Sequence, residues 1–155
     1  MKKEIKQIAL SIKHKCGFDK WRVFFLAFLL VYTYFLLIDL GVMTIQWDEA
    51  NHLNGGLLLL NGDTQSYMDS AMFYPPLYDV ITAISFGTWG ISVFSARLVA
   101  VIFALLSLVV IYESVNKVIG KRTALLSAIF LGTMPGFIWA ARVALVETML
   151  IFFFS

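Results

Sequence analysis

Residues 46–54 read Gln-Trp-Asp-Glu-Ala-Asn-His-Leu-Asn and follow directly on an apolar run that covers residues 23–45. Two adjacent carboxylates, Asp48 and Glu49, therefore stand where the chain leaves that run. Acidic side chains are costly to hold near hydrocarbon, and those found there are usually functional. Asp48 and Glu49 either begin a solvated loop or form part of a site at a membrane surface.

The composition is that of a membrane protein. Hydrophobic residues make up 60% of the 155-residue chain and charged residues 14%, whereas soluble domains carry about a quarter charged residues. As a helix, the apolar run rises roughly 34 Å, enough to cross a hydrocarbon core. The sequence therefore predicts an all-α, multi-spanning integral membrane protein. Its single cysteine, Cys16, indicates nothing about the redox compartment.

The distribution of Lys and Arg predicts the topology. Seven of the twelve lie in residues 1–22, three more are Lys117, Lys121 and Arg122, and residues 23–96 contain none. Because cytoplasmic segments are enriched in these residues, we expect a basic cytoplasmic tail over residues 1–22 and a cytoplasmic turn around Lys121. The long apolar run without a cleavage pattern is typical of an uncleaved signal anchor.

We expect the transmembrane domain to begin at residue 23 and to extend through residue 155. The expected spans are listed here: about 23–45, 95–116, 123–141 and the start of a further span at 148–155. The outer loop between the first two, residues 46–94, is expected to carry interfacial helices, one over residues 49–60. The apolar segment 77–91 is assigned to the outer interface, because a crossing there would put the basic turn outside.

The last third of the chain contains a predicted kink and the start of a further span. Pro135-Gly136 predicts a kink near the outer end of the third span. The eight residues that follow Glu147 cover less than half a bilayer as a helix. We therefore expect this chain to be the N-terminal portion of a longer protein and to be inactive by itself.

In this topology, the unusual polar residues all lie on the outer side. They are Asp48, Glu49, His52, Arg97, Arg142 and Glu147. An arginine at the end of a span either snorkels to lipid headgroups or grips a phosphate, whose oxygens match the guanidinium fork. His52 is either an interface residue or a metal ligand.

Several short motifs, in this order, resemble the N-terminal part of the GT-C glycosyltransferases. They are the signal-anchor span, the Asp-Glu loop, Tyr-Pro-Pro-Leu, Ser-Ala-Arg-Leu, Gly-Lys-Arg-Thr-Ala-Leu-Leu and Ala-Ala-Arg-x4-Glu. The most similar group is the dolichyl-phosphate-mannose protein mannosyltransferase and lipid A aminoarabinose transferase type. The resemblance covers nearly the whole chain after residue 21.

The resemblance implies roles for individual residues. Asp48 matches the loop carboxylate implicated in catalysis, with Glu49 beside it, and Glu147 stands where the family commonly has Asp. Arg97 matches the arginine that opens the second span, and Tyr74 replaces a histidine found in many members. The expected catalytic residues are thus Asp48, Glu49 and Glu147. The expected substrate-binding residues are Arg97, Arg142, His52 and Tyr74.

The expected reaction moves a sugar from a polyprenyl-phosphate-linked donor to an acceptor hydroxyl of a lipid, glycan or protein. We expect it on the non-cytoplasmic face of a plasma (inner) membrane, with membrane lipids as partners and no nucleic acid. A carboxylate would take the hydroxyl proton, and an arginine would stabilise the leaving phosphate. A divalent metal is left open, because its use varies in the superfamily.

Two other functional classes remain open from the residues alone. In an ion- or proton-coupled transporter, Asp39, Asp48 and Glu49 would bind a cation, since intramembrane acids suit ion relays as well. In a non-catalytic membrane scaffold, the acidic loop would bind a partner.

Overall fold

The computed structural model describes residues 19–70 and 76–155, and within these ranges it contains helices and no strand. The helices are α2 (Lys20–Leu37), α3 (Trp47–Leu60), α4 (Thr64–Ser70), α5 (Pro76–Trp89), α6 (Val93–Val118), α7 (Lys121–Gly132), α8 (Pro135–Ala141) and α9 (Glu147–Phe154). The predicted all-α membrane fold is confirmed, since two helices are long and apolar enough to cross a membrane. These are α2, with 18 residues, and α6, with 26.

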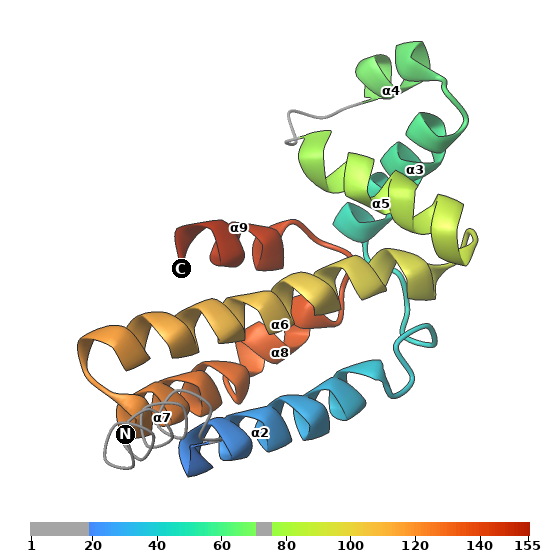
Figure 1. Cartoon of the computed structure of the whole chain (residues 1–155). Helices are drawn as coiled ribbons and strands as arrows, with labels where there is room; N and C mark the ends of the chain where they lie inside the picture. The colour runs from blue at the N-terminus through green and yellow to red at the C-terminus, as the bar shows by residue number, and fades with distance from the viewer. Residues whose placement is uncertain (1–18, 71–75) are drawn as a thin grey trace, which may run out of the picture.

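The helices form a bundle with a cap at one end. Figure 1 shows α2, α7 and α8 running beside α6, while α3, α4 and α5 gather above the N-terminal half of α6. Helix α6 packs against α2, α5, α7, α8 and α9. Ala96, Ala100 and Ala104 of α6 are fully buried, and such small side chains let neighbouring helices approach closely. The second predicted span is therefore the central helix of the fold.

Helix α2 ends earlier than the expected limit of residue 45. Its last residue is Leu37, and Asp39 has a φ of 52°. This left-handed conformation is unfavourable for most L-residues and cannot continue a right-handed helix. At 18 residues α2 rises roughly 27 Å, which is close to the thickness of a hydrocarbon core.

The third apolar segment is broken where a kink was predicted. Helix α7 ends at Gly132, α8 begins at Pro135, and the two axes differ by 69°. Proline lacks an N–H and fits the first turn of a helix, so it favours a new start at this point. By length and composition, α7 and α8 together qualify as one broken membrane span or as a re-entrant loop.

Two ion pairs join the start of α2 to the C-terminal part of α6 and to the start of α7. Lys121 Nζ lies 2.6 Å from Asp19 Oδ2, and Arg22 Nη2 lies 3.5 Å from Glu113 Oε1. The basic clusters near residue 20 and residue 121 therefore lie at the same end of the bundle, as the charge pattern predicts.

Helices α3 and α5 pack closely at the opposite end. A Cβ added to Gly55 would lie 2.9 Å from Asp79 Oδ2, and one added to Gly56 would lie 2.8 Å from Thr82 Cγ2. Only glycine permits this approach of the two helices. The helix expected over residues 49–60 is present as α3, which begins two residues earlier, and its position at the membrane interface stays a prediction.

Candidate active site

A buried ion pair lies where α3 meets the N-terminal part of α6. Arg97 Nε and Nη2 donate to the two carboxylate oxygens of Glu49, at 2.6 and 2.7 Å. Glu49 is 0% exposed and Arg97 is 1% exposed. Bidentate pairing of this kind is strong and fixes both side chains in one geometry.

Each partner of the pair also binds the backbone. Glu49 Oε1 accepts from the N–H of Ala144 at 2.9 Å, and Glu49 Oε2 accepts from the N–H of Gln46 at 3.3 Å. Arg97 donates to the carbonyl oxygens of Leu40 and Thr44, at 2.7 and 3.3 Å. The pair therefore joins α3, α6, the segment after α2 and the segment before α9.

The charge state of Glu49 follows from these contacts. Burial raises the pKa of its carboxyl, but the hydrogen bonds and the charge of Arg97, with the N–H groups of Ala144 and Gln46, outweigh burial. The net pKa lies below the ordinary value of 4.5. Glu49 is therefore an anion that already accepts several hydrogen bonds.

Asp48 and Glu147 are both exposed, unlike Glu49. Asp48 lies in the first turn of α3 and Glu147 in the first turn of α9. A helix N-terminus favours negative charge. Because the N–H of Ala144 binds Glu49, the segment that leads to Glu147 is fixed beside the first turn of α3.

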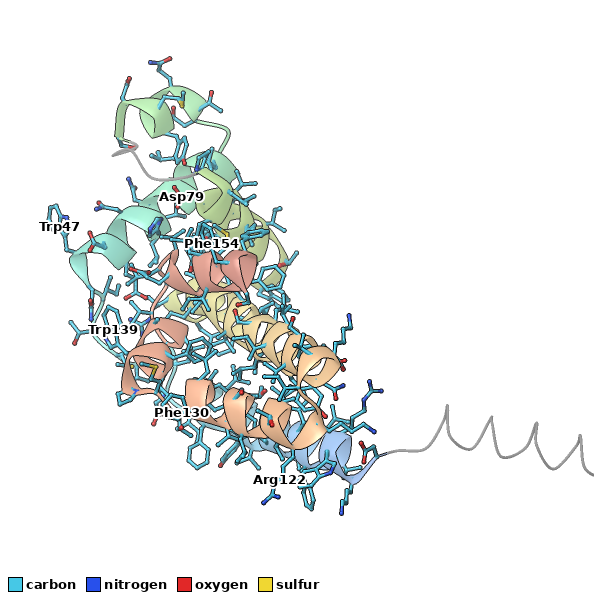
Figure 2. The ribbon with its side chains drawn as sticks, turned by 90° about the vertical axis from the view of Figure 1, so that its left-hand side faces the viewer. Trp47, Asp79, Arg122, Phe130, Trp139 and Phe154 are labelled. Atoms are coloured by element: carbon cyan, nitrogen blue, oxygen red, sulfur yellow. The ribbon has the colours of Figure 1, made fainter. Side chains whose placement is uncertain are left out.

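Trp47, the residue before Asp48 in the chain, points away from the body of the protein in Figure 2 and is 77% exposed. Tryptophan is enriched at membrane–water interfaces.

A second buried polar group links α3, α4 and α5. His52 Nδ1 and Asp79 Oδ1 are 2.7 Å apart, and the hydroxyl of Tyr67 donates to Asp79 Oδ2 at 2.9 Å. The side chains of His52, Asp79 and Tyr67 are all buried, and Figure 2 shows Asp79 between the ribbons of the cap. The two carboxyl oxygens of Asp79 thus contact α3 and α4, and the contact with Nδ1 fixes the orientation of the His52 ring.

Tyr78 lies between the two polar groups. Its ring packs edge-on against His52, with centroids 5.0 Å apart, and its buried hydroxyl has no hydrogen-bond partner among the described residues. Burial, and then the charges of Glu49, Asp79 and Glu147, raise its pKa well above 10.0. The tyrosine therefore stays neutral beside three acidic groups.

Arg142 closes the C-terminal end of α2. Its Nη1 donates to the carbonyl of Phe35 at 3.0 Å, and its Nη2 donates to that of Ile38 at 2.6 Å. These are carbonyls that a helix end leaves without intrahelical partners. Arg142 is half-buried and, unlike Arg97, pairs with no carboxylate among residues 19–70 and 76–155.

The structure thus brings together some of the expected site residues and not others. Glu49 and Arg97 touch, and His52 lies one turn further along α3. Asp48 and Glu147 lie on the surface at the same end of the bundle, while Tyr74 lies outside the described residues.

Sequence reasoning did not include Asp79, Tyr67 or Tyr78 among the expected site residues. An ionisable side chain in an otherwise apolar segment was the available signal for Asp79. Within the described ranges, no group of three His, Cys, Asp or Glu side chains is arranged to hold a metal ion.

The model of the family described as dolichyl-phosphate-mannose-protein mannosyltransferase matches residues 74–155, more than half of the 155 residues. The chain belongs to this family. No curated protein and no solved structure gives a match. The protein is therefore a mannosyltransferase-type membrane glycosyltransferase, which is the class that the sequence predicted.

The segment that carries the family match includes Arg97, Arg142 and Glu147, whereas Asp48, Glu49 and His52 precede it. The Glu49–Arg97 pair and the Ala144–Glu49 hydrogen bond connect the two parts. The capping helix α3 and the matched segment are therefore joined directly in the fold.

Proposed function

We propose that this mannosyltransferase family member transfers a sugar from a polyprenyl-phosphate-linked donor to an acceptor hydroxyl of a lipid, glycan or protein. The hydrogen bond from Ala144 to Glu49 carries the proposal. It holds the exposed Asp48 on α3 beside the segment that bears Arg142 and Glu147. Carboxylates and an arginine at one end of a membrane bundle suit transfer from a lipid phosphate.

We further propose that this end lies on the non-cytoplasmic side of a plasma (inner) membrane and that the N-terminus is cytoplasmic. The positive-inside rule supports this orientation, because the basic start of α2 and the α6–α7 turn lie together at the other end. The ion pair between Lys121 and Asp19 is the contact that joins them.

In the proposed reaction, Asp48 is the general base. The acceptor oxygen forms a bond to the anomeric carbon, its proton passes to the Asp48 carboxylate, and the bond from that carbon to the phosphate oxygen breaks. The bonding electron pair leaves with the polyprenyl phosphate. Asp48 suits the base because it is exposed, whereas the oxygens of Glu49 are already occupied by Arg97 and Ala144.

Glu49 and Arg97 are accordingly proposed as positioning residues. Their pair fixes the first turn of α3 and so the direction in which Asp48 projects. The guanidinium of Arg97 donates to four acceptors, which leaves little capacity for a donor phosphate. The contact between His52 and Asp79 is likewise proposed to fix α3 against α5.

Arg142 and Glu147 are proposed to face the donor. Two N–H groups of Arg142 hold α2, and its other N–H groups have no partner among residues 19–70 and 76–155. A guanidinium presents five donors in a fork that matches phosphate oxygens. Exposed Glu147 is a second carboxylate near the reacting sugar. Tyr74 stays a candidate contact to the substrate.

The test is a transfer assay with the full-length natural protein in vesicles. A polyprenyl-phosphate sugar labelled in the sugar is supplied with an acceptor that carries free hydroxyl groups, and labelled glycoside is separated from donor. Product that depends on the protein and on both substrates supports the proposal. Intact donor, together with protein-dependent ion uptake into the same vesicles, contradicts it.

A further inference from the structure

Lysine and arginine side chains gather at the end of the bundle that lies opposite the cap. They come from the start of α2, the last turn of α6 and the first turn of α7, and Figure 2 places Arg122 far from Asp79 of the cap. Two ion pairs, at 2.6 and 3.5 Å, hold the three helices together there. We call this surface the basic end. Its five cations are all exposed: Lys20, Arg22, Lys117, Lys121 and Arg122.

The acidic side chains at the basic end do not balance its charge. Asp19 and Glu113 are the carboxylates that lie beside these cations, and each already contacts one of them. Lys117 and Arg122 have no ion pair within the described ranges. The basic end therefore has a net positive charge, and an anion is its complementary partner.

Helix stability does not explain the cation of Arg122. It stands in the first turn of α7, which contains no acidic residue and receives no side-chain cap from Gly120. A helix N-terminus carries partial positive charge, so a cation there is unfavourable for the helix. The neighbouring Lys121 is compensated by Asp19, whereas no carboxylate of the described chain compensates Arg122. The arrangement of charges therefore favours an anion from outside the chain.

Exposed apolar side chains lie between these cations. Val118 and Ile119 are 84% and 68% exposed and are flanked by lysines on both sides. On α2, Lys20 lies over the ring of Trp21, 5.4 Å from its centroid. An acidic protein surface would match the cations but would offer no apolar contact. A phospholipid with an anionic headgroup matches both, because basic and aromatic residues together are typical of the membrane interface.

We propose that the basic end binds anionic phospholipids of the leaflet in which it lies. Lys117 and Arg122 contact the headgroup phosphates, and Val118 and Ile119 contact the upper part of the acyl chains. The positive-inside rule concerns orientation during insertion, whereas this proposal concerns a selective contact in the folded protein. It does not depend on the proposed transfer reaction.

The experiment uses the full-length natural protein in phosphatidylcholine vesicles that contain a small fraction of photoactivatable lipid. This lipid is either phosphatidylglycerol or phosphatidylcholine, with the same diazirine in the upper part of one acyl chain. Phosphatidylglycerol should label the segment around Ile119 at least about fivefold more, since each cation near an anionic surface contributes about 1 kcal/mol. The preference should decline in 1 M salt, where the Debye length is about 3 Å. Equal labelling by the two lipids would overturn the proposal.

Arg122→Gln removes one exposed cation, and Arg122→Lys is its matched control. The first should lower the preference for phosphatidylglycerol about fivefold, whereas the second retains the charge and should retain the preference. Lys117→Gln should act like Arg122→Gln. An unchanged preference in both glutamine variants, or a loss in Arg122→Lys as large as in Arg122→Gln, would overturn the proposal.

Two other origins of the contact are outcomes of the same measurement. Replacement by glutamine of the five lysines in residues 2–15 should leave the segment around Ile119 preferentially labelled. Loss of the preference in that variant, with the preference intact in Arg122→Gln, would assign the lipid contact to the N-terminal tail and overturn the proposal. A photoreactive amino acid at position 119 that cross-links to a second copy of the chain, and not to lipid, would overturn it too.

Discussion

Arg97 and Glu49 are separated by 48 residues, yet the guanidinium of one grips both carboxylate oxygens of the other at 2.6 and 2.7 Å. Glu49 is 0% exposed to solvent and Arg97 is 1% exposed. Each charge is thus compensated by the other and by backbone groups. A buried charge without its partner is strongly unfavourable, so the cap and the bundle depend on this contact.

Loss of either partner should destabilise the protein. We expect Glu49→Gln and Arg97→Gln each to cost about 3–5 kcal/mol, as for removal of one member of a buried pair. Thermal unfolding in detergent measures the effect. The control is the exposed pair of Arg22 and Glu113 at 3.5 Å, where Glu113→Gln should cost less than about 1 kcal/mol. Equal costs in the two pairs would contradict the structure.

The same contact predicts a dependence on pH. The pKa of Glu49 is lowered on folding below its ordinary 4.5, so its charge stabilises the native state at pH above 4.5. That contribution is lost as the pH falls through the lower folded pKa. The difference in melting temperature between the unmodified protein and Glu49→Gln should therefore shrink on acidification below 4.5. A difference that grows at acid pH would reverse the assigned sign.

Asp48 is expected to affect turnover more than stability. Asp48→Asn keeps the size of the side chain and removes the proposed base, so sugar transfer should fall roughly 10²–10⁴-fold. The melting temperature should change little, because Asp48 is exposed. Asp69→Asn is the control, since Asp69 is an exposed acid of α4 that bonds Gln65. Undiminished transfer in Asp48→Asn would remove it from the catalytic role.

Much of the fold follows from local patterns in the sequence. The apolar run before Gln46 predicts the first span, and Pro135 predicts the break between α7 and α8. The bounds of α3 were expected within two residues, because polar residues and a turn signal at Asn61 enclose it. The early end of α2 was not predicted, because it depends on the left-handed Asp39 and on Arg142, which is distant in sequence.

The site was harder to predict, because its contacts also join residues that are distant in sequence. The sequence identifies Glu49 and Arg97 as unusual residues, but a pairing across 48 positions leaves no periodic signal. Arg97 was expected to bind substrate, and in the fold its guanidinium faces the carboxylate of Glu49; a contact of Arg97 with substrate stays a prediction. Asp79 and His52 meet only because Gly55 and Gly56 let two helices approach. Such contacts depend on tertiary structure.

That close approach leads to a prediction about glycine. A Cβ at Gly56 would lie 2.8 Å from Thr82 Cγ2 and 3.2 Å from Phe86, so Gly56→Ala should push α3 from α5 and cost about 1–3 kcal/mol, as overpacking does. Gly136→Ala is the matched control, because nothing lies within 4 Å of its added Cβ. The control should be neutral or slightly stabilising. A stable Gly56→Ala protein would show that the two helices are not closely packed.

The last prediction concerns the sides of the membrane. The contact of Lys121 with Asp19 puts the start of α2 and the α6–α7 turn at one end, and the excess of Lys and Arg there predicts that this end is cytoplasmic. In a Cys16→Ser background, Val118→Cys, at an 84% exposed position, should react with a membrane-impermeant maleimide only after cells are opened.

Met68→Cys tests the opposite end in the same background. Met68 lies on α4 in the cap and is 73% exposed, so its cysteine should react in intact cells. The two variants serve as controls for each other. Met68→Cys should react in intact cells, whereas Val118→Cys should react only after the cells are opened. Reaction of Val118→Cys in intact cells with protection of Met68→Cys would invert the orientation. Asp48 would then face the cytoplasm, and the proposed donor would have to be presented from that side.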